Sequence, residues 1–362
     1  MQKLIASLAL ACGAAALPSQ AIEPLAPEAL EGTHVFKVEV LQVTDIEPFQ
    51  EALAGFLDTL RSNDIVDGKN LSVHRVKIDF DIEHGGFWSR MGVLMRIRQE
   101  AVRIAAAKPD LVLTIGTPAT RYARPILEDA RIPVVFTAVA NPEDAGCVSL
   151  VDAGPGATGS TLYTDMNESM RIVRRIFPHV SRIGMIHTDD ENGVSNVAAA
   201  TASARQLGMA VTARQVAKTD SIVPSLKAMY AQGQGAQMFA VPLDAYYGLR
   251  RYEPATDLGD FGAANQVPVV TLAMVQVPGA VLYLGADFAQ VGSLAGMQAA
   301  KILKYHVKPD VLPILRQQTP NVLVDPARLA ELHMTLQPAL LANKSNGKNG
   351  FWQIAWGQLQ QE

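Results

Sequence analysis

Hydrophobic positions in the first part of the chain follow two alternating periods, one typical of strands and one typical of helices. Residues 34–43 alternate apolar and polar side chains and are rich in β-branched types, which predicts a strand. From Ile46 to Leu60 the apolar residues recur at spacings of three and four, as on one buried face of a helix. The wholly apolar run 111–115 is typical of a buried parallel strand. The pattern therefore predicts strands and helices in alternation.

The second half of the chain repeats the order of the first half. Its apolar runs predict strands at 182–186, 211–214, 238–241 and 267–272, with helices between them. Each half also ends its series with an aliphatic-Pro-Val-Val strand, at 132–135 and at 267–270. Two halves of like order predict an α/β fold with two doubly wound lobes, each a parallel sheet with helices on both faces.

The order of the elements also predicts where the lobes begin and end. We expect three passages of the chain between them, which form a three-crossover hinge near Tyr163, Gly279 and Arg316. Lobe 1 then consists of 34–163 plus 280–316, and lobe 2 of 164–279 plus 317–343. The remaining residues, 344–362, are expected to form a C-terminal tail, whose apolar end, 351–356, should dock on the protein.

The N-terminal residues 1–21 have the features of a signal peptide. Lys3 precedes an apolar stretch, 4–17, and Ser19 and Ala21 supply small residues at positions −3 and −1 of a cleavage site. An alternative is a lipoprotein signal in which Cys12 is acylated, but the apolar run before Cys12 is short. We expect an exported, periplasmic protein that is released rather than anchored by a lipid.

Composition narrows the possible function classes. Hydrophobic residues make up 49% and charged residues 18%, a globular composition that excludes a disordered or collagen-like chain. The net charge is −4 and no long Lys/Arg run occurs, so nucleic-acid binding is not expected. The two cysteines, Cys12 and Cys147, are too few for a disulfide framework or a cysteine zinc site.

Several short motifs resemble known cofactor, metal or catalytic sites, but each lacks a required part. Residues 154–159 match G-x-G-x-x-G, but Pro155 interrupts the motif and a strand-like segment follows it instead of a helix. Asp190 begins a calcium-like loop that has Ala199 where a bidentate Glu is required. The seven histidines form no HExxH pattern, and no GxSxG motif or P-loop occurs. We expect no cofactor, no metal site and no enzymatic activity, although a triad assembled from distant residues stays open.

The candidate binding residues follow the ends of the predicted strands. In open α/β sheets ligands bind beyond the carboxyl ends of the strands, where loops offer backbone N–H groups to a carboxylate and acidic side chains to an ammonium. The alternative is that each residue only caps its own helix. The candidates are Thr44, Asp45, Thr117, Ala119, Thr120, Thr137, Asn141, Asn192, Asp244 and Asp287. We expect Thr117 to donate to a ligand carboxylate and Asp244 to pair with a ligand ammonium.

Several of these segments resemble one family. The chain resembles the substrate-binding proteins of ABC transporters whose better-known members bind tryptophan and tyrosine. The resemblance rests on Gly-Thr-Pro-Ala at 116–119, on the run 132–139, and on the spacing of that run to Asn141-Pro142 and to 154–159. The resemblance extends over 35–341 and implies a type I periplasmic binding protein fold with the ligand held between two lobes. Asp244 matches an Asp of the family. Asn141 departs from it, since Asp is usual there, and 79–90 is longer and more aromatic than usual.

The sequence therefore predicts an exported, monomeric solute-binding protein that passes a small polar or zwitterionic, amino-acid-like ligand to an ABC permease. One alternative uses the same fold as a sensor that presents the ligand to a membrane receptor. Another is a periplasmic enzyme with its site in the cleft.

Overall fold

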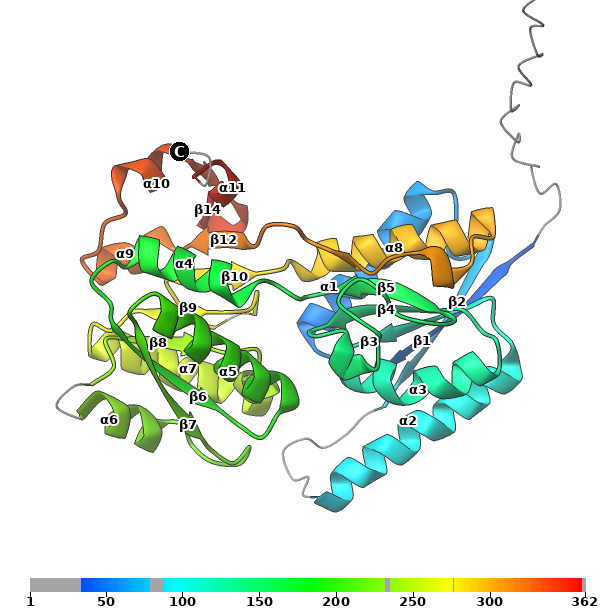
Figure 1. The fold of residues 1–362 in the computed structure, drawn as a ribbon, viewed down its shortest axis with the longest axis horizontal. Helices are drawn as coiled ribbons and strands as arrows, with labels where there is room; N and C mark the ends of the chain where they lie inside the picture. The colour runs from blue at the N-terminus through cyan, green and yellow to red at the C-terminus, as the bar shows by residue number, and fades with distance from the viewer. Residues whose placement is uncertain (1–33, 79–86, 232–234, 276, 360–362) are drawn as a thin grey trace, which may run out of the picture. The chain divides into compact units, whose positions relative to one another are not determined.

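A computed structural model describes residues 34–78, 87–231, 235–275 and 277–359 (Figure 1). The expected signal peptide, the alternative acylation site Cys12 and most of the unusual aromatic segment lie outside the described residues. Within those residues, no helix combines the length and the apolar character that a membrane crossing needs.

The first sheet has six parallel strands in the order β11-β5-β4-β3-β1-β2. Its strands are β1 (Phe36–Gln42), β2 (Leu71–Lys77), β3 (Leu111–Ile115), β4 (Val134–Val139), β5 (Ala157–Thr161) and β11 (Leu315–Arg316). Val38 of β1 lies opposite Val73 of β2 and Leu111 of β3. The accompanying helices are α1 (Glu47–Ser62), α2 (Phe87–Ala107), α3 (Thr117–Asp129) and α8 (Phe288–Tyr305), with the short 3₁₀ helices η1 (Glu143–Ala145) and η3 (Pro309–Val311).

The second sheet has eight strands in the order β13-β14-β12-β10-β9-β8-β6-β7. Its strands are β6 (Arg182–His187), β7 (Ala210–Gln215), β8 (Met238–Val241), β9 (Val269–Thr271), β10 (Leu282–Gly285), β12 (Asn321–Val324), β13 (Lys344–Asn346) and β14 (Trp352–Ile354). Strands β7, β6, β8, β9 and β10 are parallel, whereas β12, β14 and β13 join them in antiparallel pairs.

The helices that accompany the second sheet come from the middle and the end of the chain. They are α4 (Met166–Ile176), α5 (Glu191–Gln206), α6 (Val223–Ala231), α7 (Leu249–Ala264), α9 (Pro326–Glu331), α10 (Pro338–Ala342) and α11 (Trp356–Leu359), with the 3₁₀ helices η2 (Ala245–Gly248) and η4 (Lys348–Gly350).

Each sheet is covered by a hydrophobic core on both faces. On one face of the first sheet, α1 and α8 pack over Val38 and Val40, whereas α2 and α3 pack over Leu41 on the other face. In the second sheet, α4 and α5 belong to one core and α6 and α7 to the other. Period-two alternation along each strand sends neighbouring side chains to opposite faces, and this is why one strand contributes to two cores. The predicted fold of two doubly wound parallel sheets is confirmed, and the structure adds three antiparallel strands, β12, β14 and β13, to the second sheet.

Two expected boundaries differ from the strand pairing in the structure. Residues 282–285 were assigned to lobe 1, but they form β10, which pairs with β9 and β12 in the second sheet. The chain therefore leaves this sheet after Gly285, close to the start of α8, and not near Gly279. The chain also passes from the first sheet to the second between β5 and α4 and between β11 and β12.

The residues assigned to a C-terminal tail also belong to the second sheet. Strands β13 and β14 extend it beside β12, and Trp356 is buried in its core. The indole Nε1–H of Trp356 donates to Glu168 of α4. The apolar side chains of this segment can be buried only against the sheet, which explains why the chain end docks there.

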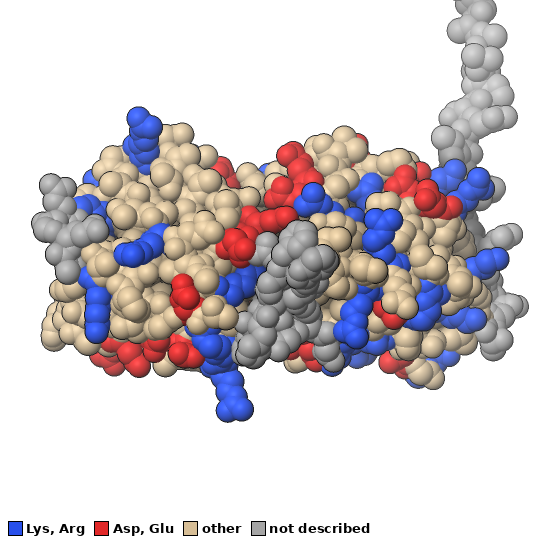
Figure 2. Space-filling view, turned by 90° about the horizontal axis from the view of Figure 1, so that it is seen from below, with Lys and Arg blue, Asp and Glu red and all other residues tan. Residues whose placement is uncertain are grey.

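Charged side chains of both signs are interspersed on the face of the molecule that Figure 2 shows. Basic and acidic groups both lie among a majority of uncharged residues, and acidic groups gather near the middle and at the lower left of this view. The mixed pattern gives this face no extended field of a single sign.

Candidate ligand-binding site

The strand order places the candidate site at one edge of each sheet. The order β2-β1-β3 in the first sheet recurs as β7-β6-β8 in the second sheet. The chain leaves β1 for α1 on one face and β3 for α3 on the other face, so a crevice opens beyond the carboxyl ends of these two strands. Thr44, Asp45 and Thr117 all lie in the segments that follow β1 or β3.

The first turn of α3 has backbone N–H groups without helical acceptors. Gly116 is the N-cap and has no side chain that could cap the helix, and its own N–H donates to the carbonyl of Thr137 at 2.9 Å. The N–H groups of Thr117 and Ala119 come too early in the helix for an i−4 acceptor, and Pro118 has no N–H. These two N–H groups and the positive end of the helix dipole favour an anion at this position.

The hydroxyl of Thr117 adds a third donor at the same helix end. Its Oγ1 atom is buried and has no hydrogen-bond partner among the residues that the structure describes. Buried hydroxyl groups are normally hydrogen-bonded, because desolvating one without a partner costs about 1–3 kcal/mol. An unpartnered buried hydroxyl beside free helix N–H groups is the arrangement expected of a ligand site.

Phe49 of α1 packs against this turn. Gly116 has φ +87°, and a Cβ atom there would lie 2.9 Å from Cζ of the Phe49 ring. Both the backbone conformation and the contact therefore require glycine. An aromatic side chain at the edge of the α3 turn had not been predicted as part of the site, although the helical spacing of apolar residues included it.

Three predicted residues of this region are fully buried, and two of them make internal hydrogen bonds. The Thr120 hydroxyl lies 2.9 Å from the carbonyl of Gly116 and 2.9 Å from the hydroxyl of Thr114. The Thr137 hydroxyl accepts a hydrogen bond from Ser160 at 3.1 Å. Ala119 is fully buried in the core between α2 and α3, so only its backbone N–H could serve a ligand. Thr120 and Thr137 therefore support the site rather than present a free hydroxyl.

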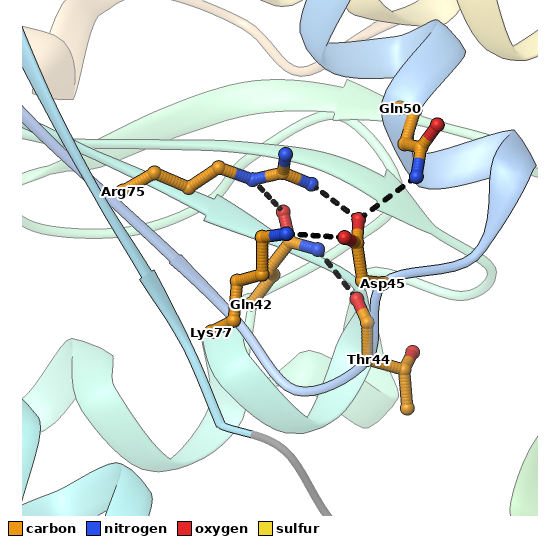
Figure 3. A network of polar contacts seen from close by, with 6 residues as sticks. All are labelled: Gln42, Thr44, Asp45, Gln50, Arg75 and Lys77. Atoms are coloured by element: carbon orange, nitrogen blue, oxygen red, sulfur yellow. Dashed lines mark hydrogen bonds and ion pairs between the residues drawn. The ribbon is translucent and has the colours of Figure 1, made fainter.

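Asp45 lies within a network of polar side chains (Figure 3). Its carboxylate accepts from Arg75 at 2.7 Å, from Gln50 at 3.1 Å and from the ammonium of Lys77. The hydrogen bond from Lys77 is the main reason why the pKa of Asp45 lies below its usual value. Two cations already balance this carboxylate, which leaves it poorly placed to bind the ammonium of a ligand.

Gln42 links the same network to Thr44. It accepts from Arg75 Nε at 2.9 Å and donates through its amide to the carbonyl of Thr44 (Figure 3). The network therefore fixes the segment that leaves β1, and the half-buried side chain of Thr44 remains a predicted ligand contact.

Asp244 is buried and its carboxylate bridges two loops of the second sheet. It accepts from the N–H of Thr188 at 2.6 Å, from the Thr188 hydroxyl at 3.1 Å and from the N–H of Tyr246 at 2.9 Å. Its side chain therefore caps η2 and ties this turn to the loop after β6. Gly193 makes room for it, since a Cβ atom there would lie 2.5 Å from Asp244 Oδ2. Internal donors already occupy the carboxylate that we expected to pair with an ammonium.

A second acidic residue, Asp190, lies beside Asp244. It caps α5 by accepting from the N–H groups of Asn192 at 3.0 Å and Gly193 at 3.3 Å. Burial and, next, the negative charge of Asp244 raise its pKa. The side chain of Asn192 itself is half-buried at the start of α5, where it stays a predicted ligand contact.

The two remaining candidates make local contacts. Asp287 accepts from Gln290 at 2.8 Å and so caps α8, while its N–H donates to the side chain of Gln317 at 3.0 Å. Asn141 donates to the carboxylate of Asp144 at 3.2 Å in the turn after β4. Asp287 therefore shows the capping alternative, whereas Asn141 makes a side-chain contact within its turn and does not cap η1, whose N-cap is Pro142.

Two polar groups of the second sheet had not been predicted. The Thr271 hydroxyl at the end of β9 and Oδ1 of Asn196 in α5 are buried without a hydrogen-bond partner in the described part of the chain. The position of Thr271 at the end of an apolar strand was a usable signal. Nothing in the sequence distinguished Asn196 from the other polar residues of its helix. Within the same residues, no three His, Cys, Asp or Glu side chains are grouped as a metal site requires.

Comparisons with known proteins agree on the family and the fold. Residues 37–348 match the family model described as ABC transporter substrate binding protein. A tyrosine-binding protein of Clostridioides difficile is 22% identical over 300 residues, which cover 82% of this chain and 81% of that protein.

Solved structures of similar fold include a domain from Streptococcus pneumoniae in complex with L-Trp. It is 20% identical, with a TM-score of 0.70 over 85% of this chain and 98% of that one. A substrate-binding protein with adhesive properties from Clostridium difficile, in a ligand-free, open form, is 20% identical, with a TM-score of 0.67 over 84% of this chain and 97% of that one. At these identities the structures show a shared fold.

Proposed function

The chain belongs to the ABC transporter substrate-binding protein family, and from this premise we propose that it binds an amino-acid-like zwitterion outside the cytoplasm and delivers it to an ABC permease. Proteins of this family bind small molecules and work with membrane components of ABC transporters. The relatives named for tyrosine and tryptophan make aromatic amino acids the first ligands to test.

The α3 helix end carries this proposal. Among the described residues, the buried hydroxyl of Thr117 has no partner and the N–H groups of Thr117 and Ala119 have no helical acceptor, so one helical turn offers three donors. A carboxylate accepts several hydrogen bonds at once, and bonds to a charged group are about twice as strong as neutral ones. We assign the ligand carboxylate to this turn, with Phe49 beside it as an apolar wall.

The ammonium of the ligand has fewer candidate partners than the sequence suggested. Asp45 already forms ion pairs with Arg75 and Lys77. The carboxylate of Asp244 already accepts hydrogen bonds from Thr188 and Tyr246. The unpartnered Oδ1 of Asn196 and the hydroxyl of Thr271 remain as neutral acceptors in the second lobe. We therefore propose that hydrogen bonds to neutral oxygens, rather than a salt bridge to Asp244, hold the ammonium.

Calorimetric titration with matched ligands tests the carboxylate assignment. L-Tryptophan and L-tyrosine are titrated beside tryptamine and tyramine, which lack the carboxylate, into wild type and Thr117→Val. Loss of the hydroxyl should weaken binding of the amino acid about tenfold or more, by about 1.5–3 kcal/mol, and leave binding of the amine unchanged. Thr212→Val, which removes an exposed hydroxyl from β7 of the second sheet, is the control for a general effect of replacing threonine by valine. Equal losses of affinity for the amino acids and for the amines would contradict the assignment of the ligand carboxylate to the first turn of α3.

A further inference from the structure

A shallow depression of about 320 Å³ lies on the second lobe between α4, α5 and the start of α10. It is lined by Arg171, Arg174, Arg175, Pro178, Leu207 and Gln337. The segments after α4 and α5 lead into β6 and β7, so Pro178 and Leu207 lie near the amino ends of these strands. The depression is therefore at the opposite edge of the sheet from the loops that follow β6 and β8, and it is separate from the candidate ligand site.

Three arginines of one helix line this depression. Arg171, Arg174 and Arg175 are spaced i, i+3 and i+4 on α4, which places them on one face. Arg171 pairs with Glu168 at 2.6 Å, and Arg174 donates to the carbonyl of Val180 at 3.1 Å. Arg175 is exposed and makes no hydrogen bond or ion pair within the described residues. One carboxylate therefore faces three cations, and the depression carries an excess of positive charge.

Helix stability accounts for only part of this arrangement. Arg174 and Arg175 lie in the last turn of α4, where cations interact favourably with the helix dipole. Arg171 lies one turn earlier, and Pro178 and Leu207 add apolar side chains to the lining of the depression, which we call its apolar floor. Arginine with an apolar floor is typical of surfaces that recognise carboxylates of a partner.

We propose that this surface, formed by Arg171, Arg174, Arg175, Pro178 and Leu207, binds an acidic segment of the membrane partner. Side chains at i and i+3 or i+4 on a helix lie about 5–6 Å apart at Cβ, and alternate residues of an extended peptide lie about 7 Å apart. An extended segment with Asp or Glu at alternate positions can therefore contact successive arginines and lay its other side chains on the apolar floor. The identity of the partner rests on the proposed transport function, whereas the acidic chemistry rests only on the surface itself.

A synthetic octapeptide of alternating Glu and Thr, with a terminal fluorophore, is the probe. Fluorescence anisotropy at low salt should show saturable binding to the whole protein, and the same peptide with Gln in place of Glu should bind at least tenfold more weakly. Arg175→Gln should weaken binding of the Glu peptide about threefold, and Arg171→Gln with Arg175→Gln about tenfold, since each exposed charge pair contributes modestly. Raising the salt concentration should also weaken binding of the Glu peptide to the wild type, because salt screens interactions between exposed charges.

Arg98→Gln removes an equal charge from an exposed position on α2 of the other lobe, and it should leave binding of the peptide unchanged. Equal affinity of wild type and the double variant, or of the Glu and Gln peptides, would overturn the proposal. Displacement of the peptide by inorganic phosphate at equal concentration would also overturn the proposal, because the surface would then be a site for small anions. Amino-acid titrations on the same variants separate the two proposals, since they should be unchanged if only this surface is altered.

Discussion

Thr188 donates both its backbone N–H and its hydroxyl to the carboxylate of Asp244, which lies 56 residues further along the chain. This contact joins the loop after β6 to the turn after β8, the two segments that flank the switch point of the second sheet. Asp244 thus joins two loops of the candidate site, which predicts a structural role for its carboxylate.

Asp244→Asn should destabilise the protein, because an amide cannot replace this carboxylate. The amide has one acceptor oxygen and would turn its NH₂ group toward the N–H of Thr188 or of Tyr246. We expect a loss of about 1–3 kcal/mol in the free energy of unfolding, measured in urea. Asp287→Asn should lower the free energy of unfolding by less, because the Asp287 side chain accepts from the backbone N–H of Gln290 and an amide oxygen can do the same. Wild-type stability with a large loss of ligand affinity would instead place Asp244 in contact with the ligand.

Thr117→Val and Thr120→Val should differ in their effect on stability. The Thr120 hydroxyl makes two buried hydrogen bonds, so its removal should lower the free energy of unfolding by about 1–3 kcal/mol. The Thr117 hydroxyl makes none in the described structure, so its removal should leave stability unchanged or slightly raised. Urea unfolding without ligand measures both variants, and a large loss for Thr117→Val would mean that its hydroxyl has a structural partner.

The Asp45 network should make stability depend on pH in the acid range. The pKa of Asp45 is lowered below 3.8 in the folded protein, so its contribution is present above that pH and is lost as pH falls through the folded value. The difference in unfolding free energy between wild type and Asp45→Asn should therefore shrink as pH is lowered below about 4. Asp58→Asn, at an exposed ion pair with Arg61, is the control and should show a small difference throughout. A constant difference for Asp45→Asn would contradict the network.

Cys147 should be unreactive in the native protein. Burial raises the pKa of its thiol to about 11, partly offset by the nearby guanidinium of Arg124. In a Cys12→Ser chain at pH 8, we expect labelling by a thiol reagent to be slow under native conditions and rapid in urea, because the thiolate is the reactive form. Rapid native labelling would show that the region around η1 opens readily.

Ligand binding should change the relative position of the two lobes. The chain passes between the two sheets three times, after β5, after β10 and after β11, and these passages can serve as a hinge. Small-angle scattering should show a smaller radius of gyration at saturation with the ligand. An unchanged radius at saturation would count against closure.

Much of the fold follows from the order of apolar runs in the sequence. Period-two and helical spacings identified the strands and helices of both halves, because buried parallel strands and amphipathic helices each leave a local pattern. Pro118, which favours the first turn of a helix, likewise indicated Thr117 at the start of α3. Both conclusions depend on neighbours within a few residues.

Only the tertiary structure decided which sheet received β10 and whether the acidic candidates were free. A short apolar run such as Leu282–Gly285 fits either sheet, and pairing with β9 and β12 settles the matter. Asp45 meets cations 30 and 32 residues away, and Asp244 meets donors on another loop. The sequence does not distinguish a carboxylate that is free to bind a ligand ammonium from one that already accepts three internal hydrogen bonds. Its availability depends on groups that the fold brings from distant parts of the chain.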